Sequence, residues 1–382
     1  MKILFLTDGI FPFQLGGMQK HSLVLAKLLA KEKNHLHIVH CGGENYNSNA
    51  FLELFDSDER EYVEETVVKF ARTDPFPGHY IRENKMYSKN IYFEFEDSIS
   101  SFDLIYAQGF TGWRFIKEKH KKKFDIPIFV NFHGLEMYQV APSLRVKAEY
   151  TLFKNAVKWN LRNADFVYSF GGKIDAILIE LGVAADKILL QSNGIEKKWL
   201  VNKVPKNNEI RKFVFIGRAE RRKGIEELNK ALHLLIADNI PFEFTFIGPI
   251  KPDLQIKDNR INYKGEIRDS EKIKEILKTQ DCLVCPSHAE GMPTVILEAM
   301  ACGLAIIATD VGAVQRQIQN NGILLEKPEI KALFMALTDI VNLADEQLAE
   351  YKENSLKLIQ NKFLWEKVVA QKIEDFKSCL VV

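Results

Sequence analysis

Two carboxylates, Glu290 and Glu298, flank a predicted helix start at Pro293. Proline suits the first turn of a helix, where its missing N–H would have no partner. Because an apolar strand precedes the loop, the free helix amides point outward past a strand end, and such amides bind phosphate. Carboxylates beside a phosphate are suited to bind hydroxyl groups, as an acidic residue binds ribose in dinucleotide folds. On spacing alone, a solvated loop residue and a surface helix residue explain the pair equally well.

Two cations, Arg218 and Lys223, follow another predicted strand, residues 212–216. If this strand neighbours the one before the first carboxylate, both cations face the helix amides, and a diphosphate fits between them. The alternative is that both are surface charges. We expect the adjacent Arg221 and Arg222 to be solvated.

Two features of the first half also lie at strand ends. His133 follows a predicted strand at residues 127–132, which places it at the crevice edge of an open α/β sheet. Its imidazole can donate or accept a hydrogen bond at pH 7, although a core histidine is the alternative. Gly16 and Gly17 follow the strand at 2–7 and let the backbone approach a ligand. The loop has neither the dinucleotide fingerprint nor a P-loop, and a plain tight turn is its alternative.

No residue set predicts a metal site. Asp56 and Asp58 form a D-x-D, but no apolar strand precedes them and more charges follow, so we expect a solvated loop or helix start. Cys282 and Cys285 form a C-x-x-C within a strand, where residues three apart point to opposite faces. We therefore expect buried core thiols.

The elements that must position these residues fall into two series of strands and helices. A polar segment at 201–211 separates the series and predicts the linker. Gly, His, Arg and Glu recur at the strand ends of both series. This pattern predicts an α/β protein with two facing Rossmann-like domains and a cleft between them.

Composition limits the classes of partner. The 382 residues carry a formal net charge of +1, so no bulk field indicates nucleic acid. No apolar run reaches the length of a spanning helix, and the first residues are too briefly apolar for a secretion signal. We expect a cytoplasmic protein. Basic residues at 117–123 and on the helix at 144–161 are typical of solvated faces, but they leave open a peripheral contact with anionic lipid at the inner face of the membrane.

The order of the motifs resembles that of the retaining glycosyltransferases of family 4, which have the GT-B fold. Seven pieces spanning nearly the whole chain carry the resemblance: the Gly16-Gly17 loop, N-F-H-G at 131–134, S-N-G-I-E at 192–196, G-R-A-E-R-R-K-G at 217–224, I-G-P at 247–249, Y-K-G at 263–265 and E-G-M-P-T-V-I-L-E at 290–298, the family's E-x7-E motif.

The resemblance implies a role for each residue. Arg218 and Lys223 would hold the donor diphosphate, Glu298 the ribose, and Glu290 the hydroxyls of the sugar. His133 would lie over the sugar. The remaining donor-binding positions are backbone groups near sugar and phosphate: Gly16, Gly17, Gly291, Met292, Pro293 and Thr294.

The resemblance also implies the reaction. The sugar keeps its anomeric configuration, and no metal or other cofactor is expected, because Arg and Lys take the metal's electrostatic role. Residues 1–204 would bind the acceptor and residues 205–364 the donor, with the helix at 365–382 packed back on the first domain. The chain departs from the family at three places. Residues Gly312-Ala313-Val314-Gln315-Arg316 stand where the family commonly has Gly-Gly-x-Pro-Glu. Gly134 stands where the family commonly has Asp, and Ser192 where it commonly has Pro.

We therefore predict a hexosyltransferase that uses a UDP- or GDP-linked sugar. Its acceptor would be a glycan or lipid-linked glycan in cell-surface polysaccharide, lipopolysaccharide or glycolipid synthesis. Two alternatives stay open: a nucleotide-sugar epimerase or hydrolase on the same fold, and a non-catalytic subunit of a glycosyltransferase complex.

Overall fold

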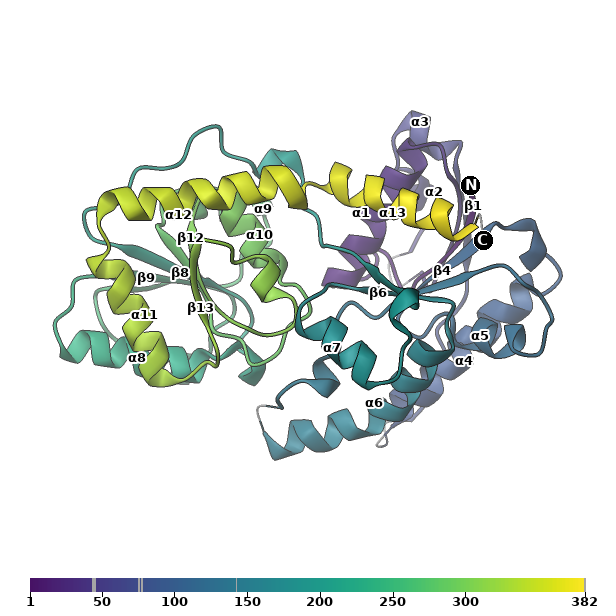
Figure 1. The fold of residues 1–382 in the computed structure, drawn as a ribbon, viewed down its shortest axis with the longest axis horizontal. Helices are drawn as coiled ribbons and strands as arrows, with labels where there is room; N and C mark the ends of the chain where they lie inside the picture. Colours follow the sequence, from purple (N-terminus) through teal and green to yellow (C-terminus); the bar gives the residue numbers. More distant parts are fainter. Residues whose placement is uncertain (43–45, 75, 77, 142, 381–382) are drawn as a thin grey trace.

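The computed structural model describes residues 1–42, 46–74, 76, 78–141 and 143–380, which form two α/β units side by side (Figure 1). The first unit contains a seven-stranded parallel sheet in the order β3-β2-β1-β4-β5-β6-β7. Its strands are β1 (Lys2–Leu6), β2 (His35–His40), β3 (Val63–Val67), β4 (Leu104–Gln108), β5 (Ile128–Asn131), β6 (Phe166–Ser169) and β7 (Ile188–Leu190).

The second unit contains a six-stranded parallel sheet in the order β10-β9-β8-β11-β12-β13. Strands β8 and β11 are neighbours in it, which is the pairing that the predicted phosphate site requires. The strands are β8 (Lys212–Ile216), β9 (Glu243–Ile247), β10 (Ile261–Tyr263), β11 (Cys282–Cys285), β12 (Ala305–Thr309) and β13 (Gly322–Leu325).

Helices cover both faces of each sheet, as parallel sheets require. In the first unit they are α1 (Gly17–Lys31), α2 (Ser48–Leu52), α3 (Ser57–Arg60), α4 (His79–Phe95), α5 (Trp113–Lys119), α6 (Leu144–Asn163) and α7 (Lys173–Glu180). In the second they are α8 (Ile225–Ala237), α9 (Ser270–Leu277), α10 (Thr294–Ala301), α11 (Ile330–Asn342) and α12 (Asp345–Leu358). In the described part of the chain, none is long and apolar enough to cross a bilayer.

Alternate side chains of β1 pack into two different hydrophobic clusters, one on each face of the sheet. Leu4 and Leu6 pack on the face covered by α4 and α5, whereas Ile3 and Phe5 pack on the opposite face with Leu25 of α1. All four strand residues are buried, because successive side chains of a strand point to opposite faces and both faces are covered. The sheet therefore holds its carboxyl edge rigidly toward the second unit.

The chain crosses between the units twice, and the two crossings lie together. Ile195 and Leu364 form a parallel β-bridge, and the N–H of Ile195 donates to the carbonyl of Phe363 at 2.8 Å. Ile195 and Trp199 pack in one cluster with Phe170, which follows β6, and with residues of α10, so this cluster joins the two units. The linker at 201–211 stays a prediction.

The last helix, α13 (Trp365–Leu380), follows α12 through a π-helical turn at Ile359–Phe363 and packs on the first unit. Figure 1 shows it in yellow beside α1. Its residues Val369 and Phe376 share a buried cluster with Phe5 of β1, and α13 contacts α1 directly.

The acidic segment at 44–73 is more regular than its sequence indicates; its residues 44 and 45 lie outside the described part. It forms α2, α3 and the edge strand β3, and α4 follows. Asp56 is the N-cap of α3, with a capping box to Glu59, which agrees with the predicted helix start. Cys282 and Cys285 are buried in β11, as predicted.

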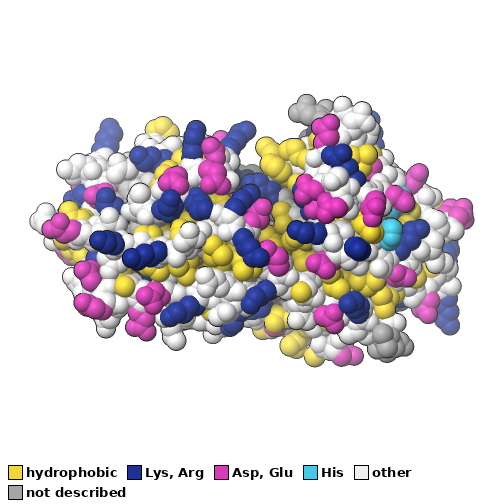
Figure 2. All heavy atoms as spheres, turned by 90° about the horizontal axis from the view of Figure 1, so that it is seen from above, with side chains coloured by type: hydrophobic (Ala, Val, Ile, Leu, Met, Phe, Trp, Pro, Cys, Tyr) yellow, Lys and Arg dark blue, Asp and Glu magenta, His cyan; other side chains and the backbone are white. Residues whose placement is uncertain are grey.

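Charges of both signs alternate over the surface. Figure 2 shows Lys and Arg interspersed with Asp and Glu on one face, without a large patch of a single sign. This agrees with the net charge of +1. The basic run at 117–123 surrounds the buried carboxylate of Glu118, whose oxygens accept from Lys121 at 3.0 Å and Lys123 at 3.1 Å. Part of that run therefore neutralises a buried acid.

Candidate active site

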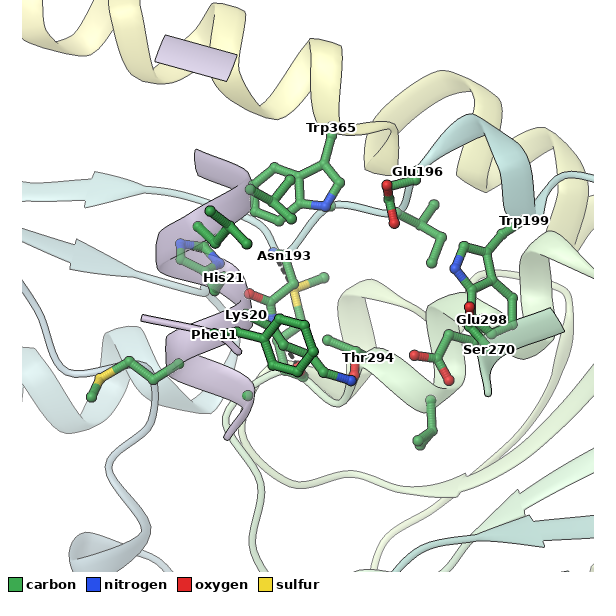
Figure 3. A pocket seen from close by; sticks show the side chains of 18 of the residues that line it. Phe11, Lys20, His21, Asn193, Glu196, Trp199, Ser270, Thr294, Glu298 and Trp365 are labelled. Carbon is green, nitrogen blue, oxygen red and sulfur yellow. Dashed lines mark hydrogen bonds between the residues drawn. The ribbon is translucent and has the colours of Figure 1, made fainter. Parts of the chain in front are cut away.

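A cavity of about 920 Å³ lies between the two units and is lined by both. This volume is typical of sites that enclose a nucleotide-sized ligand. Figure 3 shows Lys20 and His21 of α1 on one side and Thr294 and Glu298 of α10 on the other. Among the predicted site residues, His133, Gly17, Lys223, Glu290, Gly291, Met292, Pro293, Thr294 and Glu298 line it, whereas Gly16 and Arg218 do not.

Glu290 lies in the loop after β11, buried against cations of the loop after β8. Its Oε1 accepts from Lys223 Nζ at 2.6 Å and from Ser287 Oγ at 2.7 Å, and its Oε2 accepts from Arg222 Nη1 at 3.3 Å. The solvated-loop alternative for this carboxylate is therefore wrong. Gly224, with φ of 72°, allows the two loops to meet, because a Cβ there would lie 1.9 Å from the carbonyl oxygen of Pro286.

The cations near Glu290 differ in part from those predicted. Arg218 keeps 73% of its side chain exposed and pairs with Glu220 at 2.9 Å instead of facing the cavity. Arg222, expected to be solvated, is 26% exposed and reaches Glu290. Arg221 is also held, by Glu227 at 2.6 Å. The short 3-10 turn at Arg221–Lys223 directs these side chains, and no sequence pattern reports that direction.

Helix α10 directs its N-terminus into the cavity. It begins at Thr294, with Pro293 as N-cap, one residue later than predicted, and it ends before Gly303, which has φ of 74°. Its first amides have no partner within the helix. Glu298, one turn after Thr294, lines the same cavity. The helix thus presents amides and a carboxylate along one wall.

The environment of Glu298 disfavours the charged form of its carboxyl. Burial raises its pKa to about 7, and Lys20 of the opposite unit partly offsets this. Figure 3 shows both side chains pointing into the cavity, with Trp199 beside the carboxylate. The sequence analysis missed Lys20 and Trp199. Lys20 lies three residues after Gly17, in the first turns of α1, and its closeness to the predicted glycine loop could have indicated that it faces the site.

His133 lies at the carboxyl end of β5, as predicted, in a left-handed backbone conformation with φ of 58°. The backbone N–H of His133 donates to Asn131 Oδ1 at 2.9 Å, and the ring Nε2 contacts Gln108 Oε1. Burial, aided by Lys372, lowers the pKa of His133 to about 3, so the ring is neutral at pH 7.

Two residues that the sequence did not indicate surround His133. The ring of His21 lies 4.7 Å from it, edge to face, and burial lowers the pKa of His21 well below its usual value. Lys372 of α13 is 2% exposed and donates to Gln191 Oε1 at 3.0 Å. Its Nζ lies 3.2 Å from the centre of the Tyr168 ring. Both residues belong to helices, α1 and α13, in which their positions follow an ordinary amphipathic pattern, so the sequence does not distinguish them.

The glycine pair opens α1. Gly16 is the N-cap in an extended conformation, and Gly17 is the first helical residue. A Cβ on Gly17 would meet nothing within 4 Å, whereas a Cβ on Gly16 would lie 2.0 Å from the Gln19 side chain. Gly17 therefore leaves open space on the cavity wall. Among the described residues, no three His, Cys, Asp or Glu side chains are grouped as a metal site.

Comparison with known families identifies the chain. The sequence model described as Glycosyltransferase Family 4 matches residues 15–199, and that described as Glycosyl transferases group 1 matches residues 210–342. The chain belongs to this glycosyltransferase family. A relative is the putative teichuronic acid biosynthesis glycosyltransferase TuaC of Bacillus subtilis, 30% identical over 56% of this chain and 54% of the relative. The match thus spans about half the length of that relative.

Solved structures show that the family's GT-B fold extends over the whole chain. Sucrose-phosphate synthase of Thermosynechococcus elongatus superposes with a TM-score of 0.77 at 20% identity, covering 100% of this chain and 99% of that one. HepE of Anabaena in complex with UDP-glucose superposes with a TM-score of 0.66 at 17% identity, covering 99% and 100%. The predicted fold class, two Rossmann-like domains that face each other across a cleft, is confirmed.

Proposed function

We propose that the chain transfers a sugar from a nucleotide-diphosphate sugar to a glycan or lipid-linked acceptor in cell-surface polysaccharide, lipopolysaccharide or glycolipid synthesis. One observation carries the proposal. Lys223, Glu290, the N-terminal residues of α10 and Glu298, all from the second unit, line the 920 Å³ cavity, and Lys223 lies 2.6 Å from Glu290. Together they offer a cation, a hydrogen-bonding carboxylate, free amides and a second carboxylate, which are the groups that a diphosphate between two polyols needs.

The donor would lie with its diphosphate on Lys223 and the amides of α10, its ribose on Glu298 and its sugar on Glu290. Lys223 would exchange its bond to Glu290 for the phosphate, leaving that carboxylate held by Ser287 and Arg222. Arg218 would have to turn inward from Glu220 to assist.

The proposed reaction is retaining and needs no metal. As the bond between the anomeric carbon and the phosphate oxygen breaks, negative charge grows on the departing diphosphate. Lys223 and the α10 amides lie on the wall where that charge develops, and preorganised groups of this kind stabilise a transition state. The leaving phosphate would take the proton of the acceptor hydroxyl, on the same face of the sugar. His133 is neutral, so it would contact the sugar as a hydrogen-bonding group.

The identities of donor and acceptor are finer proposals. HepE binds UDP-glucose and TuaC is named for teichuronic acid synthesis, which supports a UDP- or GDP-linked donor and a glycan acceptor. The first unit would bind the acceptor. The exposed side chains of Lys147 and Arg162 of α6 would suit an anionic acceptor or a peripheral contact with the inner face of the cell membrane.

Membership of the glycosyltransferase family does not favour the epimerase, hydrolase or non-catalytic alternatives. Glu290, Lys223 and His133 are all in place around the cavity, which a non-catalytic subunit would not need. Slow release of sugar with no increase on adding acceptor would favour a hydrolase.

A thermal-shift screen with UDP-, GDP- and ADP-linked sugars tests donor binding. A ligand that binds the folded state raises the melting temperature with its concentration. We expect at least one nucleotide sugar to do so, and the Lys223→Met variant to lose the shift. The absence of any shift across the panel would contradict the donor site.

Transfer itself is tested by the Glu290→Ala variant. We expect it to retain nucleotide binding and to lose transfer, because the carboxylate faces the sugar and the nucleotide lies further along the wall. The exposed Glu326→Ala serves as a control for loss of one carboxylate in the same unit. Full transfer by Glu290→Ala would refute its role.

A further inference from the structure

The loops that carry His133 and Glu290 belong to opposite units, yet they contact each other directly. Gln139 follows a short 3-10 turn at Glu136–Tyr138 in the His133 loop. Its Nε2 donates to the backbone carbonyl of Glu290 at 2.6 Å, and its Oε1 accepts from the backbone N–H of Glu290 at 3.3 Å. One carboxamide therefore satisfies both peptide groups of a single residue across the cleft.

The contact is close because two glycines remove the side chains that would obstruct it. A Cβ on Gly291 would lie 2.1 Å from the carbonyl oxygen of His133. A Cβ on Gly312, which has φ of 55°, would lie 2.1 Å from the carbonyl oxygen of Glu290. Backbone thus lies against backbone on both sides of Glu290, and small movements of this loop change the distance between Glu290 and His133.

Glu290 is anchored in two different ways. Its carboxylate is tied to its own unit by Lys223 and Ser287, which fix its direction within the second unit. Its backbone is tied to the first unit by Gln139, which fixes where it lies relative to His133. The two sugar-contacting groups have no direct bond with each other, so the carboxamide is the bridge that sets their spacing.

Resting on the proposed roles of Glu290 and His133, we propose that Gln139 is a positioning residue that sets the spacing of these two groups and so completes the sugar-binding part of the site. Other bonds hold the units together without it. Asn193 Nδ2 donates to the carbonyl of Met292 at 2.6 Å, and Arg316 Nη1 donates to the carbonyl of Gln191 at 2.7 Å. Loss of Gln139 therefore loosens the Glu290 loop locally and leaves the two units joined.

The first measurement is hydrogen exchange followed by mass spectrometry of the peptide that spans residues 288–292. In Gln139→Ala the amide of Glu290 loses its acceptor, and we expect this peptide to exchange faster than in the wild type. Gln139→Glu keeps an acceptor oxygen but sets a second oxygen against the Glu290 carbonyl, so its exchange should rise as well. Gln255→Ala is the matched control, since it removes an amide-to-carbonyl bond to Ile250 within the second unit.

The second measurement is sugar release from UDP-glucose, GDP-mannose and ADP-glucose with water as acceptor. In this reaction the bond between the anomeric carbon and the phosphate oxygen breaks, water supplies the hydroxyl to the sugar, and its proton goes to the nucleoside diphosphate. For the donor that the wild type uses, we expect Gln139→Ala to lower kcat about tenfold, on the order of two lost hydrogen bonds. The Kd of the nucleoside diphosphate should change less than twofold, because the carboxamide touches no nucleotide-binding group.

Each result decides between the proposals. Wild-type turnover in Gln139→Ala overturns the positioning role, and so does a parallel loss of nucleotide affinity, which would indicate a merely structural contact. An active wild type with an unaffected variant leaves the proposed function standing. A wild type that releases sugar from none of the three donors and shows no thermal shift with any nucleotide sugar refutes the proposed function, and the positioning role with it.

Discussion

The raised pKa of Glu298 predicts that donor binding depends on pH in the neutral range. Ribose hydroxyls donate hydrogen bonds, and the ionised carboxylate accepts them at both oxygens, whereas protonation turns one of these oxygens into a donor. Burial holds the pKa of Glu298 at about 7 in the ligand-free protein, and at neutral pH about half of the molecules therefore carry a protonated side chain. Protonated molecules must release that proton before they bind the ribose well.

The size of the effect follows from the pKa. At pH 8 about nine-tenths of the carboxyl is ionised, and at pH 6 about one-tenth. If the complex requires the ionised form, the affinity for the nucleotide sugar falls about tenfold from pH 8 to pH 6, which is about 1.4 kcal/mol. His133 does not contribute over this range, because its pKa is about 3 and its ring is neutral throughout.

Calorimetric titration with UDP-glucose at pH 6, 7 and 8 measures this dependence. UDP-glucose is preferred to UDP, because its diphosphate has no free terminal group that titrates near pH 6. The control is Glu298→Gln, which should bind more weakly than the wild type at pH 8 and with no dependence on pH. A wild-type affinity that stays constant between pH 6 and pH 8, or a slope that persists in Glu298→Gln, would refute the assignment of Glu298 to the ribose.

Three further predictions concern buried and exposed cations. Lys352→Met leaves Asp281 buried without its cation, now 2.7 Å away, and should lower the free energy of unfolding by about 3–5 kcal/mol in urea titrations; a loss below about 1 kcal/mol would contradict the burial argument. Burial lowers the pKa of Lys372 while the unfolded chain stays protonated, so the stability of the wild type relative to Lys372→Met should rise from pH 7 towards pH 10 in melting curves. Lys223→Met should weaken UDP binding more than Arg218→Met, because Arg218 is 73% exposed; equal losses would show that Arg218 turns inward on binding.

The fold was largely readable because parallel strands buried on both faces leave continuous apolar runs. β12, with five fully buried residues, is of this kind. The edge strand β3, V-E-E-T-V, is not, because one of its edges has no neighbouring strand and Glu64 faces water, whereas Glu65 accepts a hydrogen bond from Tyr46.

The residues of the candidate site were likewise only partly predictable from the sequence. Glu290, Glu298 and His133 line one cavity because each lies beside a strand end or a helix start, and topology brings such positions together. Gln139, Lys372 and Arg222 were missed, since their importance depends on side-chain direction across an interface. Arg222 is adjacent to the predicted Lys223 in a tight turn, and the geometry of that turn lets both side chains reach the carboxylate of Glu290.

The return of α13 to the first unit has a consequence for the order in which the protein folds during synthesis. Domains generally fold as they emerge from the ribosome, the N-terminal one first. Here one face of the first sheet lacks Val369 and Phe376 until nearly the whole chain has been made. The second unit, whose sheet lies entirely within residues 212–325, can therefore complete its core before the first unit does. A stalled nascent chain that contains residues 1–364 should expose apolar surface on the first unit and attract chaperones, because it lacks α13.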